Sequence, residues 1–158
     1  MDALRTFYVV RHAKAGDRDA WTGDDRNRPL TKKGFEQAEQ LVSLLAPRPI
    51  TAVFSSPYLR CVQTVEPLAR AAKLDVQLSP SLEEGSGIEG LEEFFADRAL
   101  DGVVLSTHGD IAEELVEDLT EREVVRPGYG GASKGSTWVL EVDEHGVVER
   151  ARYIPAPD

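Results

Sequence analysis

Short runs of β-branched and aromatic residues alternate along this chain with amphipathic segments that are long enough to form helices. We expect strands at residues 6–10, 52–55, 75–78, 102–107, 137–142 and 147–153. Helices are expected at residues 31–45, with Thr31 as the N-cap, and at residues 57–72, 90–100 and 111–122. Because parallel neighbours need a long crossover connection, this order predicts an α/β fold with a mostly parallel sheet covered by helices on both faces.

The C-terminal part departs from this alternation. Only the short turn at residues 143–146 separates the last two expected strands, which predicts an antiparallel pair at the end of a sheet of about six strands. A length of 158 residues fits one domain, and we interpret residues 1–158 as a single domain. Residues 83–89 and 126–135 form the two connections long enough to move.

Composition and charge exclude several classes of function. Hydrophobic residues make up 41% of the chain and charged residues 29%, a balance typical of a soluble globular protein. The N-terminus lacks an export signal, and the single cysteine, Cys61, cannot form an internal disulfide, so we expect a cytoplasmic protein without membrane association. The net charge of −10 disfavours a nucleic-acid partner. Residues 1–33, however, carry eight Lys and Arg against five Asp and Glu, so a small anionic ligand should bind near this segment.

Side chains suited to phosphate chemistry follow three of the expected strands. The first strand leads into Arg11 and His12, the helix after the second strand carries Arg60, and the fourth strand leads into His108. Since ligands of open α/β sheets bind at the carboxyl ends of the parallel strands, we expect these four residues to share one site. The third histidine, His145, lies in a charged turn and is expected to be exposed.

This combination predicts phosphoryl transfer. Arginines grip phosphoryl oxygens through paired hydrogen bonds, so Arg11 and Arg60 would neutralise the charge of the group. A histidine nitrogen can attack phosphorus and hold the group covalently, and His12 is the candidate nucleophile. His108, if protonated, would donate a further hydrogen bond to the transferring oxygens.

Four motifs in order, RHAKAG, RPLTKKG, SSPYLRCVQT and THGD, make the chain resemble the histidine phosphatase superfamily, which has the phosphoglycerate-mutase-like fold. The stretch DRNRPLTKKGFEQA is similar to the small SixA-type phosphohistidine phosphatases and to modules attached to some Nudix hydrolases, although no Nudix box is present. The resemblance implies a three-layer α/β/α sandwich and a phosphatase that needs neither metal nor cofactor. It also assigns the family's conserved pair to Arg11 and His12, its second arginine to Arg60 and its second histidine to His108.

The resemblance is less complete at two positions. Ala13 stands where the family usually has glycine, which would tighten the approach of the backbone to phosphate. The family's carboxylic acid falls in PSLEEGSG, which makes Glu84 the candidate proton donor, with Glu83 as its neighbour. Two alternatives for Glu84 stay open: the residue could be part of an exposed loop without a role, and a phosphohistidine phosphatase could work without a strong acid.

Other catalytic motifs fit poorly. GYGGASKGST resembles a nucleotide-binding P-loop, but Ser136 stands where the motif requires lysine. Cys61 lacks the downstream arginine of a cysteine phosphatase, and the scattered histidines disfavour a two-metal phosphatase.

Three functions remain. The leading hypothesis is a phosphatase acting through a phosphohistidine intermediate on the phosphohistidine of a protein. The first rival is a phosphatase of a small phosphometabolite or nucleotide, with an entrance shaped by Lys14, Arg18, Trp21, Arg26 and Arg28. The second rival is a phosphate-dependent binding module without turnover.

Overall fold

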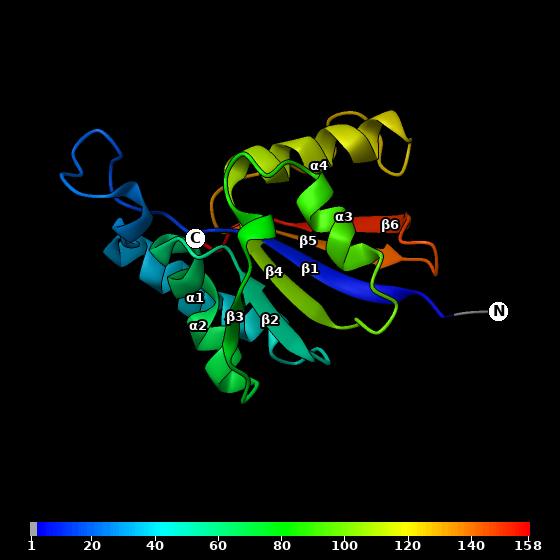
Figure 1. Ribbon diagram of the computed structural model, residues 1–158, viewed down its shortest axis with the longest axis horizontal. Helices are drawn as coiled ribbons and strands as arrows, with labels where there is room; N and C mark the ends of the chain where they lie inside the picture. The colour runs from blue at the N-terminus through cyan, green and yellow to red at the C-terminus, as the bar shows by residue number, and fades with distance from the viewer. Residues whose placement is uncertain (1–2) are drawn as a thin grey trace.

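The computed structural model describes residues 3–158, in which one six-stranded sheet carries helices on both faces (Figure 1). The strands are β1 (Arg5–Arg11), β2 (Ala52–Ser55), β3 (Val76–Leu78), β4 (Val103–Thr107), β5 (Thr137–Val142) and β6 (Val148–Ile154). The helices are α1 (Lys32–Leu45), α2 (Leu59–Ala71), α3 (Glu89–Phe95) and α4 (Gly109–Glu121), with the short 3-10 helices η1 (Asp25–Asn27) and η2 (Pro80–Leu82). Within residues 3–158, no helix has the length and apolar character needed to cross a bilayer.

The strand order in the sheet is β3-β2-β4-β1-β5-β6. Strands β1 to β4 are parallel, through the pairs β1 with β4, β4 with β2 and β2 with β3. Strand β5 is antiparallel to β1, and β6 is antiparallel to β5. The predicted α/β fold, with its mostly parallel sheet and antiparallel C-terminal pair, is therefore confirmed.

The side chains of β1 alternate between two cores. Phe7 and Val9 belong to the core under α3 and α4, where the rings of Phe7 and Phe95 pack edge to face with centroids 5.1 Å apart. Tyr8 and Val10 belong to the core under α1 and α2. A strand covered on both faces needs apolar residues at every position, which explains the uninterrupted apolar run FYVV.

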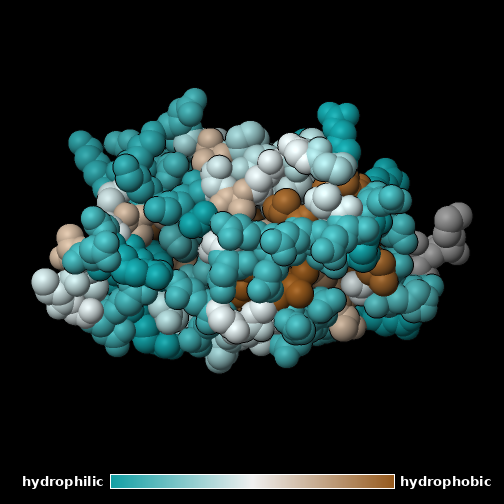
Figure 2. Space-filling model, turned by 90° about the horizontal axis from the view of Figure 1, so that it is seen from above, coloured by the Kyte–Doolittle hydropathy of each residue, from teal (hydrophilic) through white to brown (hydrophobic). Residues whose placement is uncertain are grey.

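The face on the side of α3 and α4 is largely hydrophilic, with the hydrophobic residues exposed in small patches, mainly near its middle (Figure 2). Helix α4 buries Ile111, Ala112, Leu115 and Leu119 and turns its acidic residues outward. The acidic face of this helix is therefore solvated, as expected for an amphipathic helix on a sheet.

Several helix boundaries differ from the prediction, and helix α4 begins at Gly109 instead of residue 111. Helix α2 begins at Leu59 instead of residue 57, because Tyr58 is in an extended conformation at the N-cap. Helix α3 ends at Phe95 instead of residue 100. Its end is fixed by the guanidinium of Arg5, which donates hydrogen bonds to the carbonyl oxygens of Phe95, Asp97 and Leu100.

The parallel register brings the carboxyl ends of β1, β4 and β2 to one edge of the sheet. Arg11 is paired with Thr107, and Ser55 with Ser106. Beyond the strand ends the pairing continues, since the His12 amide donates to the Thr107 carbonyl over 3.0 Å. The residues that follow these three strands therefore surround one point.

Leu105→Ala tests how far stability depends on the central strand β4. Leu105 is fully buried, so its truncation leaves a cavity and should lower the free energy of unfolding by about 2–5 kcal/mol. Leu78→Ala at the edge of the sheet is the matched control: this leucine is 59% exposed, and its truncation should cost about 0.5 kcal/mol or less. Urea unfolding measures both values, and equal losses would contradict this account of the core.

Candidate active site

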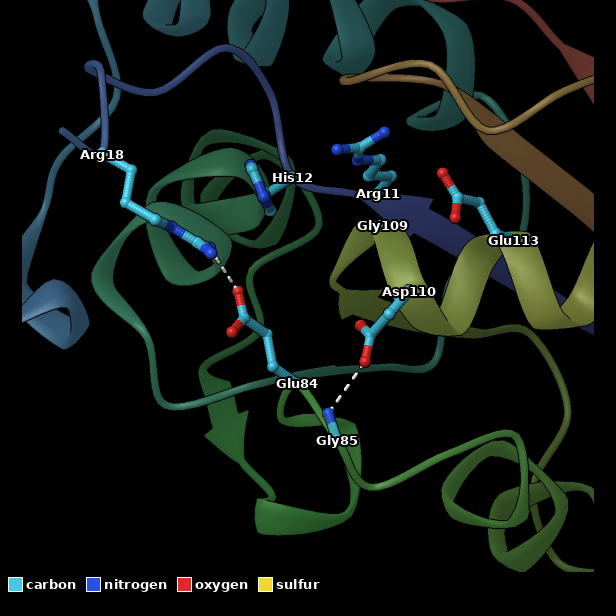
Figure 3. Close-up of a pocket in the computed structure, with 8 residues that line it drawn as sticks. All are labelled: Arg11, His12, Arg18, Glu84, Gly85, Gly109, Asp110 and Glu113. Atoms are coloured by element: carbon cyan, nitrogen blue, oxygen red, sulfur yellow. Dashed lines mark hydrogen bonds and ion pairs between the residues drawn. The ribbon is translucent and has the colours of Figure 1, made fainter.

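A cavity of about 490 Å³ lies at the carboxyl end of the parallel strands (Figure 3). It is bounded by the end of β1, the loop that follows it, the loop after η2 and the first turns of α4. The lining residues are Arg11, His12, Arg18, Glu84, Gly85, Gly109, Asp110 and Glu113. Three of the predicted site residues, Arg11, His12 and Glu84, thus line one cavity.

His12 is held as a neutral imidazole with one nitrogen free. Its Nδ1 lies 2.8 Å from the carbonyl oxygen of Ala13, which makes Nδ1–H the donor and leaves the lone pair on Nε2. Burial lowers the pKa of His12 to about 3; the hydrogen bond to Ala13 opposes this shift, and the charge of Arg60 adds to it. An unprotonated Nε2 is the form of histidine that can act as a nucleophile.

Arg60 has no exposed surface, and each end of its guanidinium meets an acceptor. Its Nη1 donates to the carbonyl oxygen of Asp25 over 2.9 Å, and its Nη2 lies 3.1 Å from Oδ2 of Asp25 and 2.9 Å from Oε1 of Glu84. The cation also lies over the ring of Tyr58, 4.9 Å from its centroid. A charge buried this deeply is retained only with such partners, so its position is fixed.

Arg11 lies at the end of β1, beside the first residue of α4. Its Nη1 donates to the carbonyl oxygen of Ala132 over 2.6 Å, whereas its buried Nε has no hydrogen-bond partner within residues 3–158. A Cβ added to Gly109 would lie 2.6 Å from Cζ of Arg11, so any side chain at that position would force the guanidinium to shift. Burial lowers the pKa of Arg11, while the charges of Glu113 and Asp110 oppose the shift.

His108 does not line the cavity, but its ring centroid lies 5.7 Å from that of His12. Its Nε2 is 2.8 Å from Oγ of Ser56, and its Nδ1 is 3.6 Å from Oε1 of Glu84. Burial and the charge of Arg60 lower the pKa of His108 to about 4. At neutral pH the ring of the free protein is therefore uncharged and donates through one nitrogen, unlike the protonated histidine considered from the sequence.

The two glutamates of the loop after η2 have different surroundings. Glu84 lies inside the cavity, where Oε1 accepts hydrogen bonds from Arg18 over 2.8 Å and from Arg60 over 2.9 Å (Figure 3). Glu83 instead pairs with Arg26 over 3.1 Å and does not line the cavity. Of the two carboxylates considered from the sequence, Glu84 is the one beside His12 and Arg60.

Ala13 is accommodated in place of the family's glycine. Its side chain is completely buried, and its amide donates to Oγ1 of Thr64 over 2.9 Å. Thr64 in turn donates to the carbonyl oxygen of Arg60 over 2.7 Å. The alanine thus belongs to a hydrogen-bonded link between the loop after β1 and helix α2.

Several residues in this neighbourhood were missed in the sequence. Asp25 lies within a quoted motif, but nothing in the pattern showed that its carboxylate would lie within hydrogen-bond distance of Arg28 and Arg60. Burial raises its pKa, but the hydrogen bond from Arg28 and the nearby arginines outweigh this effect, and the net shift is downward. Ser56, which lies within hydrogen-bond distance of His108, and Gly109, which lies against the guanidinium of Arg11, were also missed, because both contacts join residues distant along the chain.

Other candidates lie apart from this chemistry. Burial raises the pKa of Cys61 to about 12, which keeps the sulfur a thiol. His145 lies in the exposed turn between β5 and β6. Trp21 donates to the carbonyl oxygen of Asp24 and does not line the cavity. Within residues 3–158, no group of three or more His, Cys, Asp and Glu side chains is arranged to hold a metal ion.

Comparison with known proteins agrees with the fold. Over 98% of its length the chain is 38% identical to the 8-oxo-(d)GTP phosphatase of Mycolicibacterium smegmatis, although it spans only 49% of that relative. The structure of the phosphohistidine phosphatase assigned as SixA from Agrobacterium tumefaciens has a TM-score of 0.72 and 25% identity, with 87% of this chain and 91% of that chain covered.

A second structure, the protein histidine phosphatase SixA in complex with tungstate, also has a TM-score of 0.72, with 20% identity and 94% of each chain covered. At this identity the likeness concerns the fold alone. The family model for branch 1 of the histidine phosphatase superfamily matches residues 7–99, which is more than half of the chain. The match begins in β1 and includes His12 and Arg60. The chain therefore belongs to the histidine phosphatase superfamily.

Proposed function

We propose that this protein hydrolyses phosphoryl compounds through a covalent phosphohistidine on His12. The observation that carries the proposal is the unprotonated Nε2 of a buried histidine beside two guanidinium groups, those of Arg11 and Arg60. The arginines supply charge for the oxygens of a phosphoryl group, and the neutral nitrogen supplies the electron pair for phosphorus. The chemistry in this proposal needs no cofactor or metal ion.

The first step transfers the phosphoryl group to the protein. The lone pair on Nε2 of His12 attacks phosphorus, an N–P bond forms, and the bond from phosphorus to the leaving atom breaks. Glu84 would donate a proton to that leaving atom, since its carboxyl group lines the same cavity as His12. In the second step a water oxygen attacks phosphorus, the N–P bond breaks, and the water proton passes to Glu84.

Arg11, Arg60 and His108 would stabilise the charge on the transferring oxygens. The buried Nε atoms of both arginines have no hydrogen-bond acceptor within residues 3–158. Ser56 accepts from the amide of Tyr58, so its hydroxyl can donate to Nε2 of His108. The neutral His108 would then carry its proton on Nδ1, on the side of Glu84, and could donate it to a phosphoryl oxygen.

Two substrate classes have specific support. The phosphohistidine of a protein is the first, and the likeness to the structure assigned as a SixA phosphohistidine phosphatase supports it. A nucleotide is the second, supported by 38% identity to the 8-oxo-(d)GTP phosphatase of M. smegmatis. A panel with one phosphohistidine-bearing protein and a series of nucleotides, assayed by phosphate release, compares the two directly.

His12→Ala should abolish the covalent step and lower kcat/KM by about 10³-fold or more for every substrate of the wild type. Brief incubation of the wild type with a ³²P-labelled substrate should yield an acid-labile, alkali-stable phosphoryl group, which the variant lacks. His145→Ala, which changes the exposed histidine, is the control. Turnover near that of the wild type in His12→Ala would refute the proposal, and a protein that binds phosphate without turnover would be a binding module.

The ring of His12 should stay neutral well into the acid range. Its pKa is lowered from 6.5 to about 3, so a fall from pH 7 to pH 5 should leave Nε2 unprotonated and the proton on Nδ1. Two-dimensional ¹H–¹⁵N NMR of the imidazole nitrogens measures this, with His12→Asn to assign the signal. A midpoint near the ordinary histidine value would contradict the buried, neutral nucleophile.

Gly109→Ala should displace the guanidinium of Arg11 without harming helix α4. The added methyl group would lie 2.6 Å from Cζ of Arg11, and we expect kcat/KM to fall by about 10²-fold, as for the loss of one oxyanion donor. In Gly131→Ala, the matched control, the new Cβ would lie 3.5 Å from Oη of Tyr153, an ordinary contact. Steady-state kinetics and thermal unfolding of both variants separate a local effect from a loss of folding, and equal kcat/KM values would exclude the steric role of Gly109.

A further inference from the structure

A second cavity, of about 470 Å³, adjoins the candidate active site at His12. It shares Arg11, His12 and Arg18 with the first cavity and differs from it in charge. We call it the cationic pocket, because its charged lining residues are Arg11, Lys14, Arg18, Arg28 and Lys134 against one carboxylate, Asp17. The net charge of the whole chain is −10, so the positive charge of this pocket is opposite in sign to that of the chain as a whole.

Two of these cations have neither an ion pair nor a hydrogen bond at their charged groups within residues 3–158. Arg18 pairs with Glu84, and Arg28 pairs with Asp25. The ammonium groups of Lys14 and Lys134, by contrast, have no ion pair or hydrogen bond within the part of the chain that the structure describes. Burial lowers the pKa of Lys134 most, and the charges of Arg11 and Arg28 lower it further. This second contribution is the repulsion between cations that lie close to one another. An anion in the pocket would relieve this repulsion.

The backbone around both lysines is fixed. The amide of Gly135 donates to the carbonyl oxygens of Arg11 and His12, each over 3.1 Å, which fastens the residue after Lys134 to the end of β1. The amide of Lys14 donates to Oε1 of Gln37 over 3.0 Å, and its carbonyl oxygen accepts from the amide of Thr31 over 2.9 Å. The two unpaired ammonium groups therefore extend from anchored backbone next to the nucleophile.

The first cavity offers a second anion a less favourable path. Its wall on the side of α4 carries Asp110 and Glu113, and Glu84 lies on the opposite side (Figure 3). These carboxylates would repel a second negative group attached to the transferred phosphoryl group. The charges of the two cavities thus direct an additional anionic group toward Lys14 and Lys134.

We propose that the cationic pocket binds a second phosphate group of the substrate, with Lys14 and Lys134 as its specificity-determining residues. The inference rests on the proposed function, in which His12 accepts the first phosphoryl group. The second phosphate is bonded directly to the first, as in a nucleoside diphosphate, or is carried on a separate ester, as in a bisphosphate. Both sources share the same chemistry, and both favour a small substrate over a protein phosphohistidine.

Three nucleotides with the same nucleoside test this directly: adenosine 5′-monophosphate, adenosine 5′-diphosphate and adenosine 3′,5′-bisphosphate. For the wild type we expect kcat/KM to be higher for one of the two doubly phosphorylated compounds, and the better one identifies the source. In Lys134→Ala and Lys14→Ala the preference over the monophosphate should fall about ten-fold, because a charge-assisted contact is lost. Lys134→Arg, which keeps the positive charge, should keep the preference for the doubly phosphorylated compound.

The control is Lys73→Asn, which removes a lysine beyond the far end of α2 and keeps a residue that tolerates its positive φ of 61°. This variant should keep the preference of the wild type. A preference unchanged within two-fold in both Lys14→Ala and Lys134→Ala would overturn the inference, as would a wild type that favours the monophosphate.

A binding measurement separates this inference from the proposed function. By isothermal titration calorimetry, methylenediphosphonate, which has two phosphorus centres and cannot be hydrolysed at its bridge, should bind the wild type more tightly than orthophosphate. The difference should disappear in the double variant Lys14→Ala/Lys134→Ala. Equal affinities in the wild type would refute the cationic pocket even if His12 is phosphorylated, whereas tight binding without any phosphorylation of His12 would refute the proposed function alone.

Discussion

The parallel pairing of β1 with β4 and of β4 with β2 is the constraint on which the site depends. A parallel arrangement places the carboxyl ends of all three strands at one edge, so that the residues that follow them converge. His12, Ser56 and His108 are each the first residue beyond such a strand end. An antiparallel pairing of the same strands would have sent one of these residues to the opposite edge of the sheet.

Electrostatic compensation decides how the converging side chains behave. Arg60 is completely buried and forms ion pairs with Asp25 and Glu84. His12 and His108 are also buried, and their lowered pKa values leave both rings uncharged at neutral pH. Burial disfavours an unpaired charge, and the neighbouring arginine adds repulsion against a second cation. Burial is the main cause, and the same group that would hold the phosphoryl oxygens adds to the effect that keeps the nearby imidazole in its nucleophilic form.

Asymmetry around His12 connects the site to the choice of substrate. Carboxylates of α4 border one cavity, and lysines from two separate loops border the other. The loop at residues 126–135 matters here because β5 runs antiparallel to β1 and begins at the end of β1, which brings Lys134 to the nucleophile. In the sequence this lysine belongs to a glycine-rich stretch that merely resembled a P-loop. The pairing of β5 with β1 places this lysine beside His12, and no local motif predicts that position.

The sequence by itself determined the order of strands and helices, the mostly parallel sheet and the family, because apolar periodicity and short motifs are local properties of the chain. It also singled out Arg11, His12, Arg60, His108 and Glu84 as candidates. Only the tertiary structure decided which glutamate lies in the cavity, that Arg60 depends on Asp25, that Gly109 makes room for Arg11, and where helix α3 ends. These features depend on burial and on contacts between residues distant along the chain, and no short segment encodes either.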